Sequence, residues 1–107
     1  MSEFDKREEG FEKKFALDEE QKFKAEARRD RLLGLWAAEK LGMSGEAAAA
    51  YAKEVVAADF GEAGEGGALR KVMGDFAAKN VAVTEQAIRG KMSELMAVAA
   101  AEVKAGK

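Results

Sequence analysis

The chain has 107 residues, enough for one domain with a modest hydrophobic core. Its 18 basic and 20 acidic side chains give a net charge of −2, so overall charge attracts neither nucleic acid nor an anionic membrane. Cysteine and histidine are both absent, which excludes disulfides, thiolate chemistry, the commonest metal ligand and the usual general base. No apolar run approaches the ~20 residues of a membrane span, and we expect a cytoplasmic protein without direct membrane insertion.

Residues 1–18 form a charged segment that we call the arm. Its residues Phe4, Phe11 and Phe15 fall within about 40° of one another on a helical wheel, and charged side chains surround them. Burying three Phe side chains would contribute roughly 5–9 kcal/mol, whereas ordering the backbone costs about 1–2 kcal/mol per residue before helical hydrogen bonds offset it. We therefore expect a flexible or partly helical arm. Insertion into a partner's groove and folding back onto the bundle both stay open.

The remainder of the chain, residues 19–107, carries the signals of helices without proline to interrupt them. Asp18 and Gln21 have the spacing of a capping box, which predicts that a long helix begins near residue 19. Gly42 supplies the residue that favours a left-handed helix end. Between these signals lie the apolar residues that mark this helix, namely Phe23, Ala27, Leu32, Leu35, Trp36 and Leu41.

Three further helices follow. Ser44 is a candidate N-cap for a helix over about 45–60, and four glycines within 61–67 predict a flexible connection after it. An apolar stripe predicts a third helix over about 68–79, which Asn80 ends, and Thr84 is the candidate N-cap of a fourth helix that continues to the end of the chain. Short connections between four helices predict an all-α fold, a mostly antiparallel four-helix bundle.

Several segments of the chain resemble the zeta subunit of alphaproteobacterial F-type ATP synthases. The most specific is the run from Arg28 to Gly42, which contains Arg-Leu-Leu-Gly-Leu-Trp-Ala-Ala. The similarity extends to Phe11–Ala16, Asp18–Glu20 and Tyr51–Phe60, and it covers nearly the whole chain.

This resemblance implies an inhibitor of ATP hydrolysis by the F1 head. It implies that the arm enters a catalytic interface between alpha and beta subunits near the gamma rotor and blocks rotation in the hydrolysing direction only. We expect a monomer without strong pH gating, because no histidine and no dimerising heptad is present. Carried over to this chain, the apolar anchors are Phe4, Phe11 and Phe15, and the polar contacts are Arg7, Glu8, Glu12, Lys13 and Lys14.

The alternative interpretation is a small regulatory module that binds ADP or ATP, since weak nucleotide binding is also associated with the zeta family; we expect no other cofactor. The candidate residues are cations and one stacking surface, namely Arg28, Arg29, Arg31, Trp36, Arg70, Lys71 and Arg89, with Tyr51 as a second aromatic surface. The glycine-rich segment 61–67 is not followed by the Gly-Lys-Ser/Thr of a phosphate-binding P-loop. The purely structural interpretation is that the arginines form a solvated face, paired with Glu26, Asp30 and Glu39, and that Trp36 belongs to the core.

An enzymatic role has little support in the sequence. The paired carboxylates Glu8-Glu9 and Glu19-Glu20 are adjacent, so on a helix their side chains diverge and build no shared acid–base site. No metal site is expected either. We therefore predict a protein that acts by binding other subunits rather than by catalysis.

Overall fold

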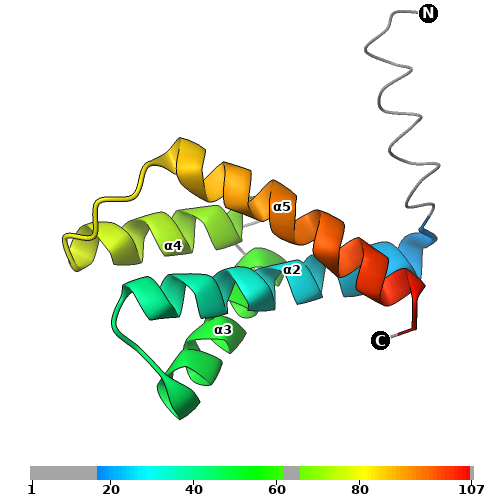
Figure 1. The fold of residues 1–107 in the computed structure, drawn as a ribbon, viewed down its shortest axis with the longest axis horizontal. Coiled ribbons are helices and arrows are strands. Elements are labelled where there is room, and N and C mark those ends of the chain that lie inside the picture. Colours follow the sequence, from blue (N-terminus) through cyan, green and yellow to red (C-terminus); the bar gives the residue numbers. More distant parts are fainter. Residues whose placement is uncertain (1–16, 62–65, 107) are drawn as a thin grey trace, which may run out of the picture.

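The computed structural model describes residues 17–61 and 66–106. All regular secondary structure within these ranges is helical (Figure 1): α2 is Glu19–Lys40, α3 is Gly45–Phe60, α4 is Gly67–Ala78 and α5 is Glu85–Lys104. The predicted all-α four-helix fold is confirmed, and each helix boundary in the described ranges agrees with the prediction to within a few residues. The predictions for the arm before residue 17 and for the connection 62–65 lie outside the described residues.

The helix ends follow the local signals in the sequence. Asp18 and Gln21 form the predicted capping box: the Asp18 carboxylate accepts from the Gln21 backbone N–H at 2.8 Å, and the Gln21 side chain accepts from the Asp18 N–H at 3.2 Å. Gly42 has φ +82°, and the Met43 N–H donates to the Ala38 carbonyl at 2.8 Å, which completes a Schellman motif. Ser44 occupies the N-cap position of α3, but its side chain makes no capping hydrogen bond.

The end of α4 and the start of α5 are defined in the same way. Asn80 takes φ +58°, and the Val81 N–H returns to the Phe76 carbonyl at 2.8 Å, so asparagine here plays the part that glycine plays at the end of α2. The Thr84 hydroxyl then accepts from the Ala87 N–H at 3.1 Å and caps α5 as predicted.

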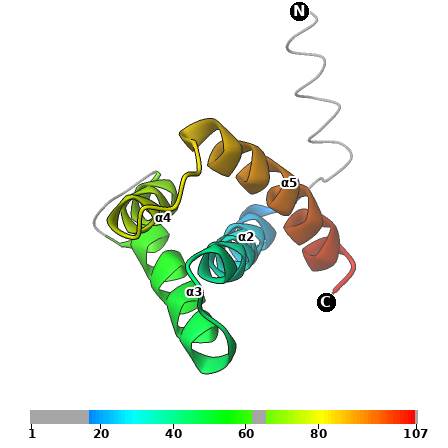
Figure 2. The same cartoon turned by 60° about the vertical axis from the view of Figure 1, so that its left-hand side comes forward.

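Helix α2 lies at the centre of the bundle. Its most extensive interfaces are with α3 and α5, which lie on opposite sides of it (Figure 2). Helix α4 packs against both α3 and α5. Helices α2 and α5 lie side by side and run in opposite directions, as do α4 and α5, whereas α3 crosses α2 obliquely. A pocket can therefore form where α2, α4 and α5 converge beside the end of α3.

The core takes large side chains from all four helices, but Leu33 is the one large apolar side chain that α2 buries fully, and its other apolar contributions are small. Leu33, Val55, Val72, Phe76 and Ile88 are fully buried. The remaining buried positions of α2 are mostly Ala or Gly, and a Cβ at Gly34 would lie only 2.6 Å from the Cα of Ala52. Small residues on this face let α2 and α3 approach closely, which the larger residues that marked the helix in the sequence would not allow.

Two of those larger residues lie at the surface or at the core margin. Phe23 is 58% exposed and packs against Phe60, which is 39% exposed, with ring centroids 4.7 Å apart. Trp36 is half-buried and places its ring edge-on to Phe76 at 5.9 Å, which agrees with the interpretation that it packs against the core. Within the described ranges, no helix combines the length and the apolar character that crossing a bilayer requires.

Candidate functional site

The predicted inhibitory residues of the arm lie outside the described residues, so the structure describes the base of the arm and not its contacts. The base is Leu17 and Asp18, directly ahead of α2. The predicted partner-binding residues that stay predictions are Phe4, Arg7, Glu8, Phe11, Glu12, Lys13, Lys14 and Phe15.

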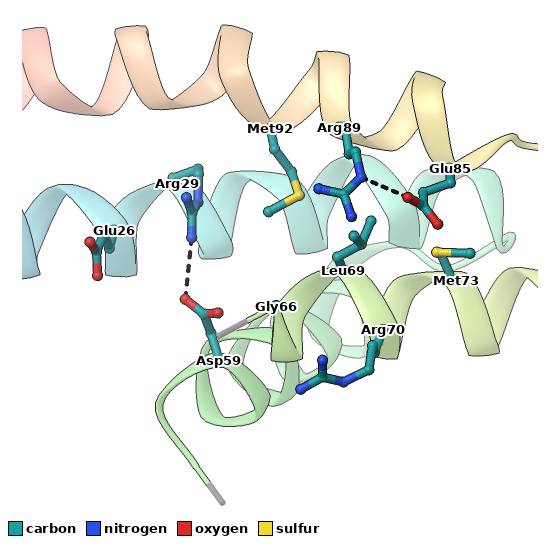
Figure 3. Close-up of a pocket in the computed structure, with 10 residues that line it drawn as sticks. All are labelled: Glu26, Arg29, Asp59, Gly66, Leu69, Arg70, Met73, Glu85, Arg89 and Met92. Atoms are coloured by element: carbon teal, nitrogen blue, oxygen red, sulfur yellow. Dashed lines mark hydrogen bonds and ion pairs between the residues drawn. The ribbon is translucent and has the colours of Figure 1, made fainter. Parts of the chain in front are cut away.

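A pocket of about 660 Å³ opens where the four helices converge (Figure 3). It brings together three of the predicted nucleotide-binding residues: Arg29 from α2, Arg70 from α4 and Arg89 from α5. These positions lie far apart in sequence, and only the packing of α4 and α5 against α2 unites them. The other lining residues are Glu26, Asp59, Gly66, Leu69, Met73, Glu85 and Met92.

The other predicted nucleotide-binding residues lie elsewhere. Arg28 pairs with Glu102 of α5 at 3.3 Å, and Arg31 points to solvent. Trp36 packs against Phe76, with the ammonium groups of Lys40 and Lys91 near its ring. The proposed cluster of seven is therefore divided by the fold into a pocket of three arginines and four separate residues.

Lys71, the last of these four, belongs to a polar contact between α3 and α4. It pairs with Asp75 at 3.1 Å, and the same carboxylate accepts from the Tyr51 hydroxyl at 2.7 Å. Burial and the neighbouring Asp75 raise the pKa of the Tyr51 hydroxyl above its ordinary value, so this group stays a hydrogen-bond donor. Tyr51 is buried and is not available as a stacking surface.

Acidic side chains balance the arginines of the pocket. Arg29 donates to Asp59 at 3.2 Å, and Arg89 donates to Glu85 at 2.7 Å. Glu26 adds a third carboxylate to the lining, while Leu69, Met73 and Met92 supply an apolar part. An anionic ligand would therefore have to replace carboxylates as the partners of Arg29 and Arg89.

The sequence analysis placed Asp30 on a solvated face as a partner of the arginines; the structure shows its pair with Arg29 but buries the carboxyl beside this pocket. Asp30 is the one charged side chain that is fully buried among the described residues. Burial is the main cause that raises its pKa from 3.8 to about 8; a hydrogen bond that the protonated form can make with Asp59 raises it further, and Arg29 lowers it. The available signal was periodicity: Asp30 shares its helix face with the buried residues Leu33, Gly34 and Ala37, three, four and seven positions later.

The part of the chain that the structure describes contains no group of three or more acidic side chains arranged to hold a metal ion. The site is instead a set of paired charges around a partly apolar hollow. Fold and site together define a small all-α bundle that places a charged, Phe-containing arm ahead of its central helix.

The comparisons with known proteins agree with the resemblance seen in the sequence. A family model described as ATPase inhibitor subunit zeta matches residues 1–102, so the chain belongs to that family. A structure solved by NMR in solution is 53% identical, with a TM-score of 0.66, and the match covers 79% of this chain and 96% of the other. A search of curated proteins finds no significant match.

Proposed function

We propose that this chain inhibits ATP hydrolysis by the F1 head of an F-type ATP synthase and that its arm is the inhibitory segment. The observation that carries this proposal is the match to the ATPase inhibitor subunit zeta family, which extends over the arm as well as the bundle. In this proposal the chain is a monomeric, cytoplasmic regulator and catalyses no reaction itself.

The proposed mechanism depends on a difference in affinity. The arm enters an interface between alpha and beta subunits near gamma, and its three Phe side chains occupy apolar contacts there. If the arm binds one rotational state of F1 more tightly than the next, leaving that state costs the difference in binding free energy. If the arm leaves its site when gamma turns in the direction of synthesis, it blocks hydrolysis and permits synthesis.

The described bundle supports this role through α2. At about 1.5 Å per residue, a helix of this length extends roughly 33 Å, and it begins at the capping box directly after the arm. Its interfaces with α3 and α5 join it to the rest of the bundle. A force on the arm would therefore be resisted by the bundle as a whole, which we place on the outside of the F1 head.

The test is ATP hydrolysis by F1 from the source organism, stripped of its own inhibitor, with purified variants added back. The full chain should inhibit, and the variant with Phe4, Phe11 and Phe15 changed to Ala should not. Val98→Ala is a suitable control because Val98 is an apolar residue that is 42% exposed on α5, far along the chain from the arm. Equal inhibition by all three proteins would refute the assignment of inhibition to the arm.

A deletion variant needs a boundary that respects α2. Asp18 caps this helix, and loss of an N-cap costs about 1 kcal/mol. Removal of residues 1–16 keeps Leu17 and Asp18, so a loss of inhibition by this variant would reflect the missing arm rather than a frayed helix. Thermal unfolding of the deletion variant should match that of the full chain.

The pocket supports a second candidate function, weak binding of ADP or ATP. Arg29, Arg70 and Arg89 provide cations for phosphates, and Leu69, Met73 and Met92 provide an apolar surface for a base. Binding is expected to be weak because the phosphates must compete with Asp59 and Glu85 for two of the arginines.

An NMR titration with ADP and ATP tests this second function. We expect saturable shifts at the pocket residues, weakened by Arg89→Gln and unchanged by Arg31→Gln, whose site lies outside the pocket. The side chain of Arg89 is 62% exposed, so its replacement should leave the fold intact. No shift at millimolar nucleotide would refute nucleotide binding and leave the inhibitory function untouched.

A further inference from the structure

The buried carboxyl of Asp30 has an unusual set of partners. Its Oδ1 accepts from Arg29 twice, from Nη2 at 2.9 Å and from Nε at 3.1 Å. Its Oδ2 is buried and has no hydrogen-bond partner among the described residues. A buried carboxylate oxygen without a donor is unfavourable, because the charge loses its hydration and no hydrogen bond replaces it.

A second carboxyl shares the same cation. The Nη2 atom of Arg29 that contacts Asp30 also donates to Oδ2 of Asp59, at 3.2 Å, and Asp59 lies in the last turn of α3 (Figure 3). One guanidinium therefore serves two acids from two helices. If Asp30 holds a proton on the otherwise unpartnered Oδ2, it becomes a donor towards Asp59, and the trio carries no net charge.

The other charged groups near this trio are already engaged with one another or line the pocket. On α2, Glu26 lines the pocket and Arg28 pairs with Glu102 of α5 at 3.3 Å. From α5, Arg89 pairs with Glu85, and from α4, Arg70 lies beside Gly66. Beyond burial itself, the pKa of Asp30 is shifted by the other two members of the trio. Asp59 raises this pKa and Arg29 lowers it.

We infer that Asp30, Asp59 and Arg29 form a proton-dependent latch that holds the last turn of α3 against α2. With the proton present, Asp30 donates to Asp59 and the two helices are joined by a neutral network. When the proton is lost, two carboxylates share one cation at a buried position, and their repulsion loosens the contact. The latch is a property of the bundle and goes beyond the proposed inhibitory function.

The surroundings of Asp59 would transmit such a change. Its neighbour Phe60 packs against Phe23 of α2, so a shift of this turn alters the aromatic contact on the surface. On the other side, Gly67 at the start of α4 lies so close to the backbone of Ala58 and Asp59 that a Cβ there would overlap the Ala58 carbonyl oxygen. Loosening the latch should therefore move the start of α4 and one wall of the pocket.

The first test is a carbon-detected NMR titration of the aspartate carboxyls in the full chain between pH 5 and 9. The Asp30 carboxyl should titrate near pH 8, far above the ordinary midpoint near 4, and the backbone signals of Phe60 and Gly67 should shift with the same midpoint. An Asp30 carboxyl that is already ionised at pH 6 would refute the latch. So would a titration near pH 8 to which Phe60 and Gly67 do not respond.

Two variants separate the latch from a merely structural role. Asp30→Asn mimics the protonated acid, since its amide can donate towards Asp59, and it should abolish the dependence of Phe60 shifts on pH between 6 and 9. Asp59→Asn removes the second negative charge and should move the Asp30 midpoint to lower pH. Asp18→Asn is the control: Asp18 is exposed, Asn is also a good N-cap, and the response should stay that of the unmodified chain. If Asp30→Asn does not fold, the titrations of the unmodified chain and of Asp59→Asn still decide the matter.

Discussion

Replacing Gly34 with Ala tests the close contact between α2 and α3. The new Cβ would lie 2.6 Å from the Cα of Ala52, 3.1 Å from its Cβ and 3.3 Å from Cγ2 of Val55. Carbon atoms prefer separations of about 3.5–4.0 Å, and the nearest atom is backbone, so the helices must move apart. Overpacking costs about 1–3 kcal/mol, against a gain of about 1 kcal/mol from the better helix propensity of Ala. Because the nearest atom is backbone and cannot rotate away, the overpacking cost should lie in the upper part of this range, about 2–3 kcal/mol, and we expect a net loss of about 1–2 kcal/mol.

The same substitution at Gly90 provides the matched control. Gly90 is exposed within α5, and a Cβ there would meet no atom within 4 Å, so Ala should stabilise the protein by about 0.5–1 kcal/mol. Thermal unfolding followed by circular dichroism should show Tm lowered by roughly 5–15 °C for Gly34→Ala and raised for Gly90→Ala. If both variants are stabilised alike, the close crossing of α2 and α3 is not what constrains residue 34.

Three further predictions concern Asp30, Tyr51 and Phe76. Because the pKa of Asp30 rises from 3.8 to about 8 on folding, its contribution to stability is complete below about pH 4 and is lost as the pH rises through about 8. Urea unfolding between pH 6 and 8 should therefore show the free energy of unfolding falling by up to ~1.4 kcal/mol per pH unit; a flat profile would contradict this. Tyr51→Phe removes the hydrogen bond to Asp75 and should cost about 1 kcal/mol in the same assay, and an unchanged midpoint would show that the bond adds nothing. Phe76→Ala should cost about 3–5 kcal/mol and shift the fluorescence of Trp36 to the red, since Phe76 is buried and covers that ring; unaltered fluorescence would argue against this contact.

The helices of the described part could be predicted from the sequence because the residues that determine their ends act locally. The Asp18–Gln21 capping box, Gly42 and Thr84 act on backbone groups no more than a few residues away, so neighbouring sequence is sufficient to place them. The choice of buried face was harder. Large apolar residues such as Phe23 marked the first helix in the sequence, but the structure buries Ala37, Ala38 and Gly34 instead, because the closeness of α3 favours small side chains.

The candidate site could be predicted only in part. The arginines were recognisable as phosphate-binding candidates by residue type, but the fold unites Arg29, Arg70 and Arg89 and leaves Arg28 and Arg31 outside. The pair of Arg89 with Glu85 is local, four residues apart in α5, whereas Asp59 reaches Arg29 from α3 and could not be predicted from neighbouring sequence. The expectation that strong pH gating is absent rested on the missing histidine, and the proposed latch would provide a pH response through a carboxyl instead.

By itself, the sequence determined the helical class, the positions of the helix ends, the charged character of the arm and the resemblance to a family that matches residues 1–102. These properties depend on residue type and on neighbours within one or two turns. The tertiary structure alone decided which faces are buried, which arginines share a pocket, and that Asp30 and Asp59 both accept from the guanidinium of Arg29. These contacts between helices depend on how closely α2 and α3 cross, and that distance is determined by the side-chain volumes of both helices together.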